Sequence, residues 1–187
     1  MKRFSGVFAA FTVMIGVTIY CGIADAYVSG TWITYTKENS GLADNDGRAI
    51  GLDGLGNMWF GTVNGLSRFN GSTWKSYTTA DKLAHNKVNA LAYELSSYGH
   101  EIWAGTDGGV TVLSVKADAV TFATPYTTMN SKYPGMISDK ITSAAVDSQH
   151  VRWFGSEGGL MSFDGKVWKS YTTADKLAHN KVSSIAY

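Results

Sequence analysis

The sequence predicts an all-β fold, a β-propeller of three complete four-stranded blades with partial strands at both ends. Three observations lead to this prediction. The 187 residues include 21 Gly, six Trp and only two Pro, a composition typical of many short strands joined by tight turns. The fifteen letters at 74–88, WKSYTTADKLAHNKV, recur unchanged at 168–182. Short apolar runs separated by turn residues fill the chain between the two copies, and no helical period is sustained there.

The composition also excludes several classes of protein. With 44% hydrophobic and 17% charged residues, the chain is not a disordered or coiled-coil protein. The formal net charge of +1 provides no basic face for nucleic acid, so no nucleic-acid partner is expected.

The first 26 residues have the pattern of a secretory signal peptide. Lys2 and Arg3 precede an uncharged stretch at 4–24, and the A-D-A at 24–26 supplies a cleavage site. Two alternatives are an uncleaved membrane anchor and a lipoprotein modified at Cys21, although Tyr20 is bulky where a lipoprotein signal has a small residue. All three export the remainder of the chain, to the periplasm, the outer face of the cytoplasmic membrane or the exterior. Residues 27–187 would form the partial propeller, which has no cysteine and depends on its hydrophobic core.

The internal repeat divides this region into blades. The two identical segments lie 94 residues apart, twice a period of about 47, and an eroded copy near 122–141 lies between them. A second landmark recurs at 59–62 (WFGT), 103–106 (WAGT) and 153–156 (WFGS), each time before a glycine turn. We therefore expect a closing outer strand at 31–36, blade 1 at 48–78, blade 2 at 87–127, blade 3 at 140–173 and the first strand of blade 4 at 181–187.

Each unit resolves into four strands. In the third unit these are expected at 141–146, 151–155, 160–163 and 167–172, with turns rich in Gly and Asp between them. Small residues fill the first strand of each unit, as expected where blades converge on an axis. The second strand is apolar on both faces, as expected for a strand sandwiched between neighbouring blades. The tryptophans are therefore predicted to be structural inter-blade packing residues, with a ligand-stacking platform as the alternative: Trp59, Trp74, Trp103, Trp153 and Trp168.

These repeats resemble a known family. The segment GNMWFGT at 56–62, with Asp53 before it and NGLSRF at 64–69 after it, is similar to the two-component regulator propeller repeat, as are Asp147 with WFGSEGGL at 153–160 and Leu83 with NKV at 86–88. The resemblance covers about 31–187. It implies an extracytoplasmic sensor propeller of a membrane histidine kinase, or a related secreted protein without a kinase. The second unit departs from the pattern, because Tyr93 replaces the aspartate and 94–101 lengthen the next loop.

Three blades do not close a ring, since closed propellers have about four to eight. An outer strand at the start of the chain and an inner strand at its end are what a propeller uses to close. We therefore expect a fragment of a longer reading frame, in which a kinase module could lie downstream of Tyr187. The alternative is that two or more copies, for example a dimer, assemble into one ring.

The loops on one face of the propeller supply candidate ligand-binding residues, because polar groups converge there at a concave mouth. The simpler interpretation is that the asparagines cap turns and the histidines are solvated. The candidates are His85, Asn86, Asp107, Glu157, His179 and Asn180.

No metal or cofactor is expected. The D-N-D-G at 44–47 resembles the start of a calcium loop, but Arg48 occupies the next ligand position and a turn is the better interpretation. The four histidines show no zinc spacing, and no catalytic signature occurs.

Three functions are therefore open. The first is an exported, non-catalytic sensor module that binds an unknown small molecule or polymer and reaches the membrane only through an anchor or a missing C-terminal region. The second is a secreted interaction scaffold. The third and least supported is an enzyme similar to streptogramin lyases, which would use His85, Glu157 and His179 with a metal.

Overall fold

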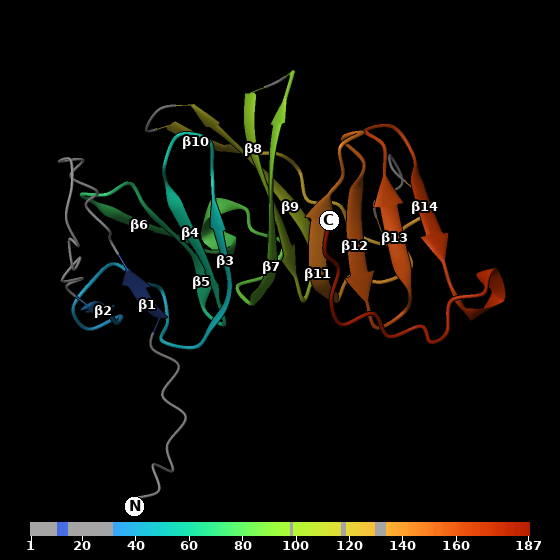
Figure 1. The fold of residues 1–187 in the computed structure, drawn as a ribbon, viewed down its shortest axis with the longest axis horizontal. Coiled ribbons are helices and arrows are strands. Elements are labelled where there is room, and N and C mark those ends of the chain that lie inside the picture. The colour runs from blue at the N-terminus through green and yellow to red at the C-terminus, as the bar shows by residue number, and fades with distance from the viewer. Residues whose placement is uncertain (1–10, 15–31, 98, 117–118, 130–133) are drawn as a thin grey trace, which may run out of the picture.

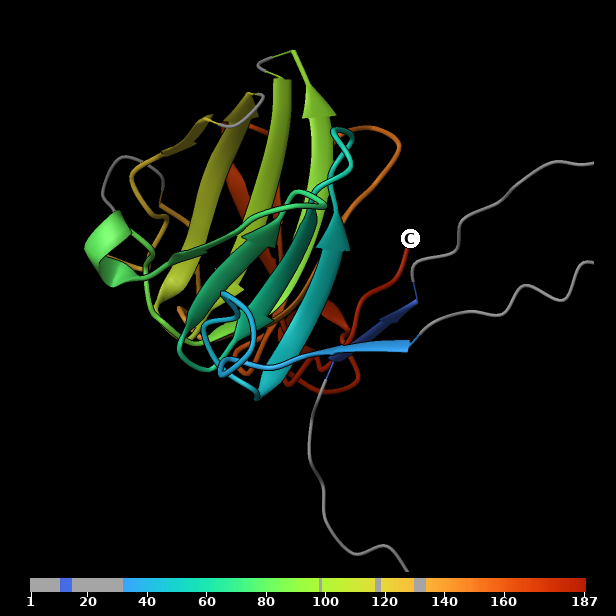
Figure 2. The ribbon, with the colours of Figure 1, turned by 90° about the vertical axis from the view of Figure 1, so that its left-hand side faces the viewer.

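The computed structural model describes residues 11–14, 32–97, 99–116, 119–129 and 134–187. These residues form three four-stranded antiparallel sheets, each with its strands in chain order, which lie side by side as three propeller blades (Figure 1). Viewed from one end, the sheets stack one behind another (Figure 2). The predicted all-β fold, an incomplete propeller of three four-stranded blades, is thereby confirmed. Most of the predicted signal peptide at 1–26 lies outside the described residues.

The blades consist of short strands joined mostly by tight turns. Blade 1 contains β3 (Gly47–Leu52), β4 (Met58–Thr62), β5 (Gly65–Phe69) and β6 (Trp74–Tyr77). Blade 2 contains β7 (Val88–Ser96), β8 (Gly99–Thr106), β9 (Gly109–Lys116) and β10 (Ala119–Phe122). Blade 3 contains β11 (Ile141–Val146), β12 (Arg152–Ser156), β13 (Leu160–Phe163) and β14 (Trp168–Tyr171).

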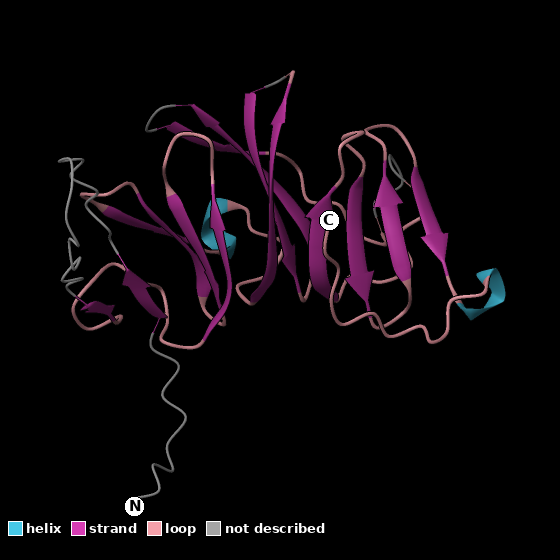
Figure 3. Cartoon of the chain, in the orientation of Figure 1, coloured by secondary structure: helices cyan, strands magenta, loops and turns pink. Residues whose placement is uncertain are grey.

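Two short 3-10 helices follow the outer strands of blades 1 and 3: η1 (Thr79–Asp81) and η2 (Thr173–Asp175), drawn in cyan in Figure 3. They come from the identical fifteen-residue segments and have the same capping box, in which a threonine and an aspartate side chain satisfy each other's backbone N–H groups. Identical sequence therefore gives identical local structure at two places in the fold.

Aromatic side chains fill the space between blades. Trp59 is fully buried together with Tyr77 and with Val88 and Leu113 of blade 2. Trp103 packs in the same way against Phe154 and other residues of blade 3. Residues adjacent to the tryptophans on the second strands point to the opposite face, so a middle strand is apolar on both sides.

Each blade repeats one stacked Trp–Tyr pair. The ring centroids are 6.1 Å apart for Trp59 and Tyr77, 6.0 Å for Trp103 and Tyr126, and 5.9 Å for Trp153 and Tyr171. The following blade covers the first two pairs. Within the described residues no blade covers the third, and Trp153 is half-buried. The tertiary environment therefore differs among equivalent tryptophans.

Two further tryptophans, Trp74 and Trp168, lie on the outer strands of blades 1 and 3. Trp168 is buried and Tyr126 of blade 2 packs against its edge, with ring centroids 5.6 Å apart. Trp74 has the same edge contact from Tyr35, at 5.2 Å, but is only half-buried. Tyr35 belongs to β2 (Trp32–Tyr35), which pairs with β1 (Phe11–Met14). The segment predicted as a closing outer strand at 31–36 thus places Tyr35 against blade 1 as Tyr126 is placed against blade 3.

The structure differs from the prediction at 181–187, which is not a strand. A strand requires a hydrogen-bonded neighbour, and no strand pairs with this segment in the described part of the chain. Val182 nevertheless contacts Gly155 as Val88 contacts Gly61 and Ile141 contacts Gly105. The segment therefore lies where the first strand of a following blade would lie.

Blade 2 also corrects the sequence alignment. The register Leu52↔Met58 in blade 1 corresponds to Tyr93↔Ile102 in blade 2, so Glu94, and not Tyr93, occupies the place of Asp53. The buried Glu94 accepts from Arg152 Nε of blade 3 at 2.6 Å. Burial first, and then the charge of Glu94, raises the pKa of nearby Glu101. Where blades 1 and 3 have an aspartate that binds the tryptophan of its own blade, blade 2 thus has a glutamate that forms an ion pair with blade 3.

Candidate functional site

A β-bulge occurs at the same place in the innermost strand of every blade. In blade 1, Gly47 pairs with Thr62 and Ala49 with Gly61, so Arg48 has no partner in the ladder. The register shifts at Asn89 in blade 2 and at Thr142 in blade 3 in the same way. Bulges redirect side chains and are common beside functional sites. All three bulged residues line one pocket at the end of the innermost strands.

The residue before each innermost strand is charged, and in blades 2 and 3 it lines the pocket. This residue is Asp46 in blade 1, Lys87 in blade 2 and Lys140 in blade 3. Lys181 has the same position relative to Val182, in the segment that follows blade 3. The pocket encloses about 360 Å³, a volume suited to a small molecule. Its lining residues are Arg48, Lys87, Asn89, Asp107, Lys140, Thr142, Glu157, Lys181 and Ser183.

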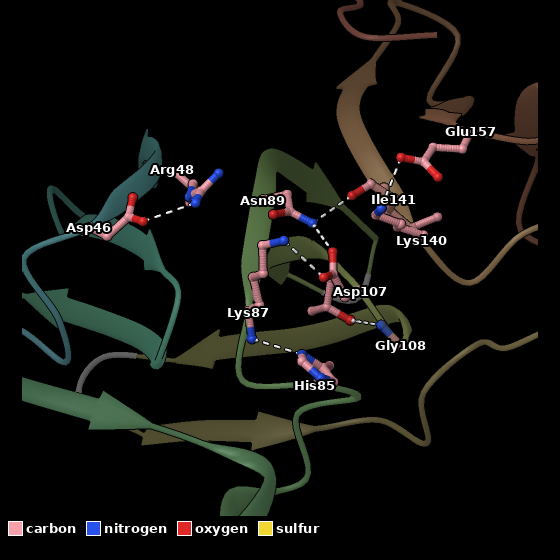
Figure 4. Close-up of polar contacts among 11 residues, drawn as sticks. Asp46, Arg48, His85, Lys87, Asn89, Asp107, Gly108, Lys140, Ile141 and Glu157 are labelled. Carbon is pink, nitrogen blue, oxygen red and sulfur yellow. Dashed lines mark hydrogen bonds and ion pairs between the residues drawn. The ribbon is translucent and has the colours of Figure 1, made fainter. Parts of the chain in front are cut away.

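Ion pairs fix the charged side chains (Figure 4). Lys87 Nζ lies 2.9 Å from Asp107 Oδ2, and Lys140 Nζ lies 2.8 Å from Glu157 Oε1. In blade 1, Arg48 contacts Asp46 at 2.9 Å. Each blade thus contributes one cation to the pocket, and each of these cations is paired with a carboxylate of its own blade or of the loops beside it.

Asn89 connects two blades at the mouth. Its Nδ2 donates to Asp107 Oδ1 at 2.7 Å within blade 2 and to the carbonyl of Ile141 in blade 3 at 2.9 Å. Both hydrogens of the amide are therefore used in the structure. Asn89 therefore links the innermost strands of blades 2 and 3 at the pocket.

Asp107 and Glu157 are ionised at neutral pH. Burial opposes the charge of Asp107, but hydrogen bonds from Asn89 and Lys87 and the charges of Lys87 and Lys140 outweigh it and hold the pKa of Asp107 below its usual value. The hydrogen bond and charge of Lys140 lower the pKa of Glu157, which is exposed. Glu157 in turn raises the pKa of Lys140. Asp107, Glu157 and Lys140 therefore keep their charges at neutral pH.

The structure brings together two of the six candidate residues, since Asp107 and Glu157 both line the pocket. The other four lie in the loops after the outer strands. Asn86 Oδ1 accepts from Thr79 N at 2.8 Å, and Asn180 Oδ1 makes the same bond to Thr173 N.

The histidines also have local partners. His85 Nδ1 accepts from Lys87 N at 3.0 Å and His179 Nδ1 accepts from Lys181 N at 2.9 Å. Neither histidine lines the pocket. Each ring thus stabilises the turn that leads to the pocket lysine two residues later.

Sequence reasoning missed the bulged residues and the lysines. The lysines could have been found, because aligning the repeats places a charged residue before every innermost strand. The bulged positions carry Arg, Asn and Thr, and this mixture has no recognisable pattern. Their common role depends on strand register, which the sequence does not show.

No group of three or more His, Cys, Asp or Glu side chains in the described ranges is arranged to hold a metal. The D-N-D-G segment forms a turn in which Asp44 accepts from Asp46 N at 2.8 Å and from Asn64 Nδ2 at 2.6 Å. Among the helices of the described residues, none has the length and apolar character to cross a bilayer.

Comparison with family models gave no match, and no curated protein sequence matches the chain. Solved structures do match. The extracellular domain of BT3049 from B. thetaiotaomicron, assigned as a hybrid two-component system, superposes with a TM-score of 0.66 at 19% identity, over 84% of this chain and 21% of that one. The extracellular domain of BT4673 from the same organism, assigned likewise, gives 0.64 at 17% identity with the same coverage.

PorZ of Porphyromonas gingivalis, described as a bacterial surface component of the type-IX secretion system, matches with a TM-score of 0.50 at 20% identity. It covers 72% of this chain and 21% of PorZ. The chain thus spans about a fifth of the length of the solved structures that it matches. The chain shares its fold with part of the two extracellular domains, which is consistent with the resemblance of its repeats to the two-component regulator propeller.

Proposed function

We propose that this chain is the ligand-binding module of an exported sensor protein, and that the ligand binds in the pocket at the mouth of the innermost strands. The observation that carries the proposal is the repeated bulge. Three successive blades direct the side chain at the same strand position, Arg48, Asn89 or Thr142, into one pocket. A binding site assembled from several blades responds to any change in their relative positions, as a sensor requires.

Export is supported by the signal-like sequence at 1–26 and by the extracellular domains that share the fold. Signalling would occur through parts of a longer protein, because the chain spans a fifth of those neighbours.

We propose that the pocket binds its ligand without transforming it. Catalysis by proton transfer near neutral pH needs a group with a pKa near that pH. Asp107 and Glu157 have lowered pKa values, and Lys140 has a raised one. The charges at the mouth therefore suit recognition better than acid–base chemistry.

A blocking substitution tests the location of the site. The full chain would be screened by thermal shift against organic acids, phosphorylated compounds, amines and sugars. Ser183→Trp places an indole in the pocket from an exposed segment outside the strands. Lys166→Trp adds the same indole in an exposed turn at the opposite end of blade 3.

A compound that raises the Tm of the wild type and of the Lys166→Trp protein, but not of the Ser183→Trp protein, is the expected result. Binding that survives Ser183→Trp would place the site elsewhere. If no compound of any class binds, the sensor function is wrong and the interaction scaffold becomes the better description. Protease accessibility of the chain on intact cells tests export separately.

A further inference from the structure

We infer that the pocket recognises a small organic anion bearing a carboxylate or a phosphate. This inference rests on the proposed binding function and specifies its ligand. The first observation is the number of cations: four of the nine lining residues are basic, and two are acidic. Adding Asp46 beside Arg48 still leaves one positive charge in excess.

The excess belongs to Lys181. Lys87, Lys140 and Arg48 each have a carboxylate within 2.9 Å. Among the described residues, no ion pair reaches Lys181, although its charge contributes to the lowered pKa of Glu157. An ammonium group without a counterion at a polar mouth attracts an anion.

The second observation is independent of Lys181 and concerns hydrogen-bond capacity. Each oxygen of Asp107 already accepts one hydrogen bond, from Asn89 or from Lys87, and both amide hydrogens of Asn89 are used as well. A lysine ammonium has three donors and an arginine five, with no acceptor. Lys87, Lys140 and Arg48 each make one side-chain hydrogen bond within the described residues.

The four cations of the mouth therefore retain several unused donors. A ligand rich in acceptors can use these donors. Carboxylates and phosphates do this, and their charge-assisted bonds to Arg and Lys are stronger than neutral ones.

The third observation is the character of the lining. No aromatic residue is among the nine lining residues, so the pocket offers no stacking surface for a flat ligand. Its volume of about 360 Å³ is near the lower end of small-molecule sites. Charge and hydrogen bonds, and not apolar contact, would therefore provide the affinity.

The test compares matched probes by ¹H–¹⁵N NMR titration of the full chain at constant ionic strength. Succinate and succinamide differ in charge but little in size, and inorganic phosphate tests the other anion. Arg48→Gln/Lys181→Gln removes two cations of the mouth, Lys181→Arg retains the charge, and Lys166→Gln removes a lysine far from the pocket. Circular dichroism would verify that each variant is folded.

We expect succinate or phosphate to bind saturably and to shift the amide resonances of the pocket residues, and succinamide not to bind. The double variant should bind at least fivefold more weakly, Lys181→Arg should bind more tightly than the double variant because it keeps the charge, and Lys166→Gln should bind as the wild type does. A stronger response to succinate than to phosphate would identify a carboxylate as the preferred group, and the reverse a phosphate.

Two results would overturn the inference. If anions bind equally to the wild type and the double variant, the pocket is not their site. The second result is that neither anion binds, whereas a neutral or cationic compound from the screen binds the wild type and not the Ser183→Trp protein. In that case the choice of ligand class is wrong but the binding function stands. Failure of every probe and every screened compound would instead remove the binding function itself.

Discussion

Asp53 organises the end of its blade through four hydrogen bonds. It accepts from the backbone N–H groups of Leu55 and Asn57, each at 2.9 Å, from the Asn57 amide at 2.7 Å and from the Trp59 indole at 2.9 Å. Burial is the largest influence on its pKa and raises it, but these hydrogen bonds together outweigh burial and lower the pKa. The carboxylate therefore connects a turn to the tryptophan that packs between blades.

Replacement of Asp53 should be costly and pH-dependent. Asp53→Ala leaves buried donors unsatisfied, so we expect a loss of about 2–4 kcal/mol of unfolding free energy at pH 7. Because the folded pKa is depressed, the stability that ionised Asp53 provides is complete above the unfolded value of about 3.9 and is lost as the pH falls through the folded pKa. Urea unfolding of both proteins should thus show the difference shrinking at acidic pH.

Asp164→Ala is the matched control, because Asp164 accepts from backbone N–H groups in an exposed turn and from no buried side chain in the described part of the chain. A loss as large as that of Asp53→Ala would show that turn formation, and not the buried indole bond, determines the effect.

At the scale of the element, the glycine of each W-x-G motif permits close contact between neighbouring blades. A Cβ atom built on Gly61 would lie 2.8 Å from Val88 Cγ1 and 2.9 Å from the Val88 carbonyl oxygen. Gly105 and Ile141 form the same contact between blades 2 and 3. Val88 and Ile141 are the first residues of the innermost strands β7 and β11. This contact therefore also positions the adjacent bulged residues, Asn89 and Thr142, that line the pocket.

Gly61→Ala should therefore separate blades 1 and 2. We expect a loss of about 1–3 kcal/mol, as for overpacking of a core, measured by urea unfolding. Gly51→Ala lies in the adjacent strand β3, where a new Cβ would have its nearest contact at 3.6 Å from Leu91, and should change the stability by much less. Equal effects of the two substitutions would contradict the role of the close contact.

At the scale of the whole molecule, position in the row of blades determines what equivalent residues contribute. Trp59 and Trp153 occupy the same motif position, donate to Asp53 and Asp147 at 2.9 and 2.8 Å, and stack on a tyrosine in the same way. Blade 2 covers Trp59 completely, whereas Trp153 is half-buried on the last face. Comparing Trp59 with Trp153 therefore measures how much a neighbouring blade adds to the stability that the tryptophan provides.

Trp59→Phe should thus destabilise the chain by about 1 kcal/mol or more beyond Trp153→Phe, because it removes more buried apolar area. Both substitutions also lose an indole hydrogen bond, which is buried at Trp59 and part-buried at Trp153, so its loss adds to the difference in the same direction. Thermal unfolding of the two proteins measures the difference. Equal losses would mean that the last face is covered in solution, as it would be if copies of the chain associate.

Much of this architecture is readable from the sequence, because repetition carries it. The recurring fifteen letters and the W-x-G landmarks predict three four-stranded blades, and the structure confirms them. Two apolar neighbours on one strand, Trp59 and Phe60, predict a strand with blades on both sides, since adjacent side chains point to opposite faces. The ligand-binding roles of His85, Asn86, Asp107, Glu157, His179 and Asn180 stay a prediction.

Only the tertiary structure decides which polar residues meet. Arg48, Asn89 and Thr142 share a pocket because a bulge shifts the register at one place in each innermost strand, and register arises from pairing between strands. The structure also shows that Asn86 and His85 make hydrogen bonds within turns. It further shows that Glu94 occupies the position in blade 2 that Asp53 occupies in blade 1. The sequence by itself determined the repeating unit, since a period is local and survives in the letters, whereas the site depends on contacts between residues far apart in the chain.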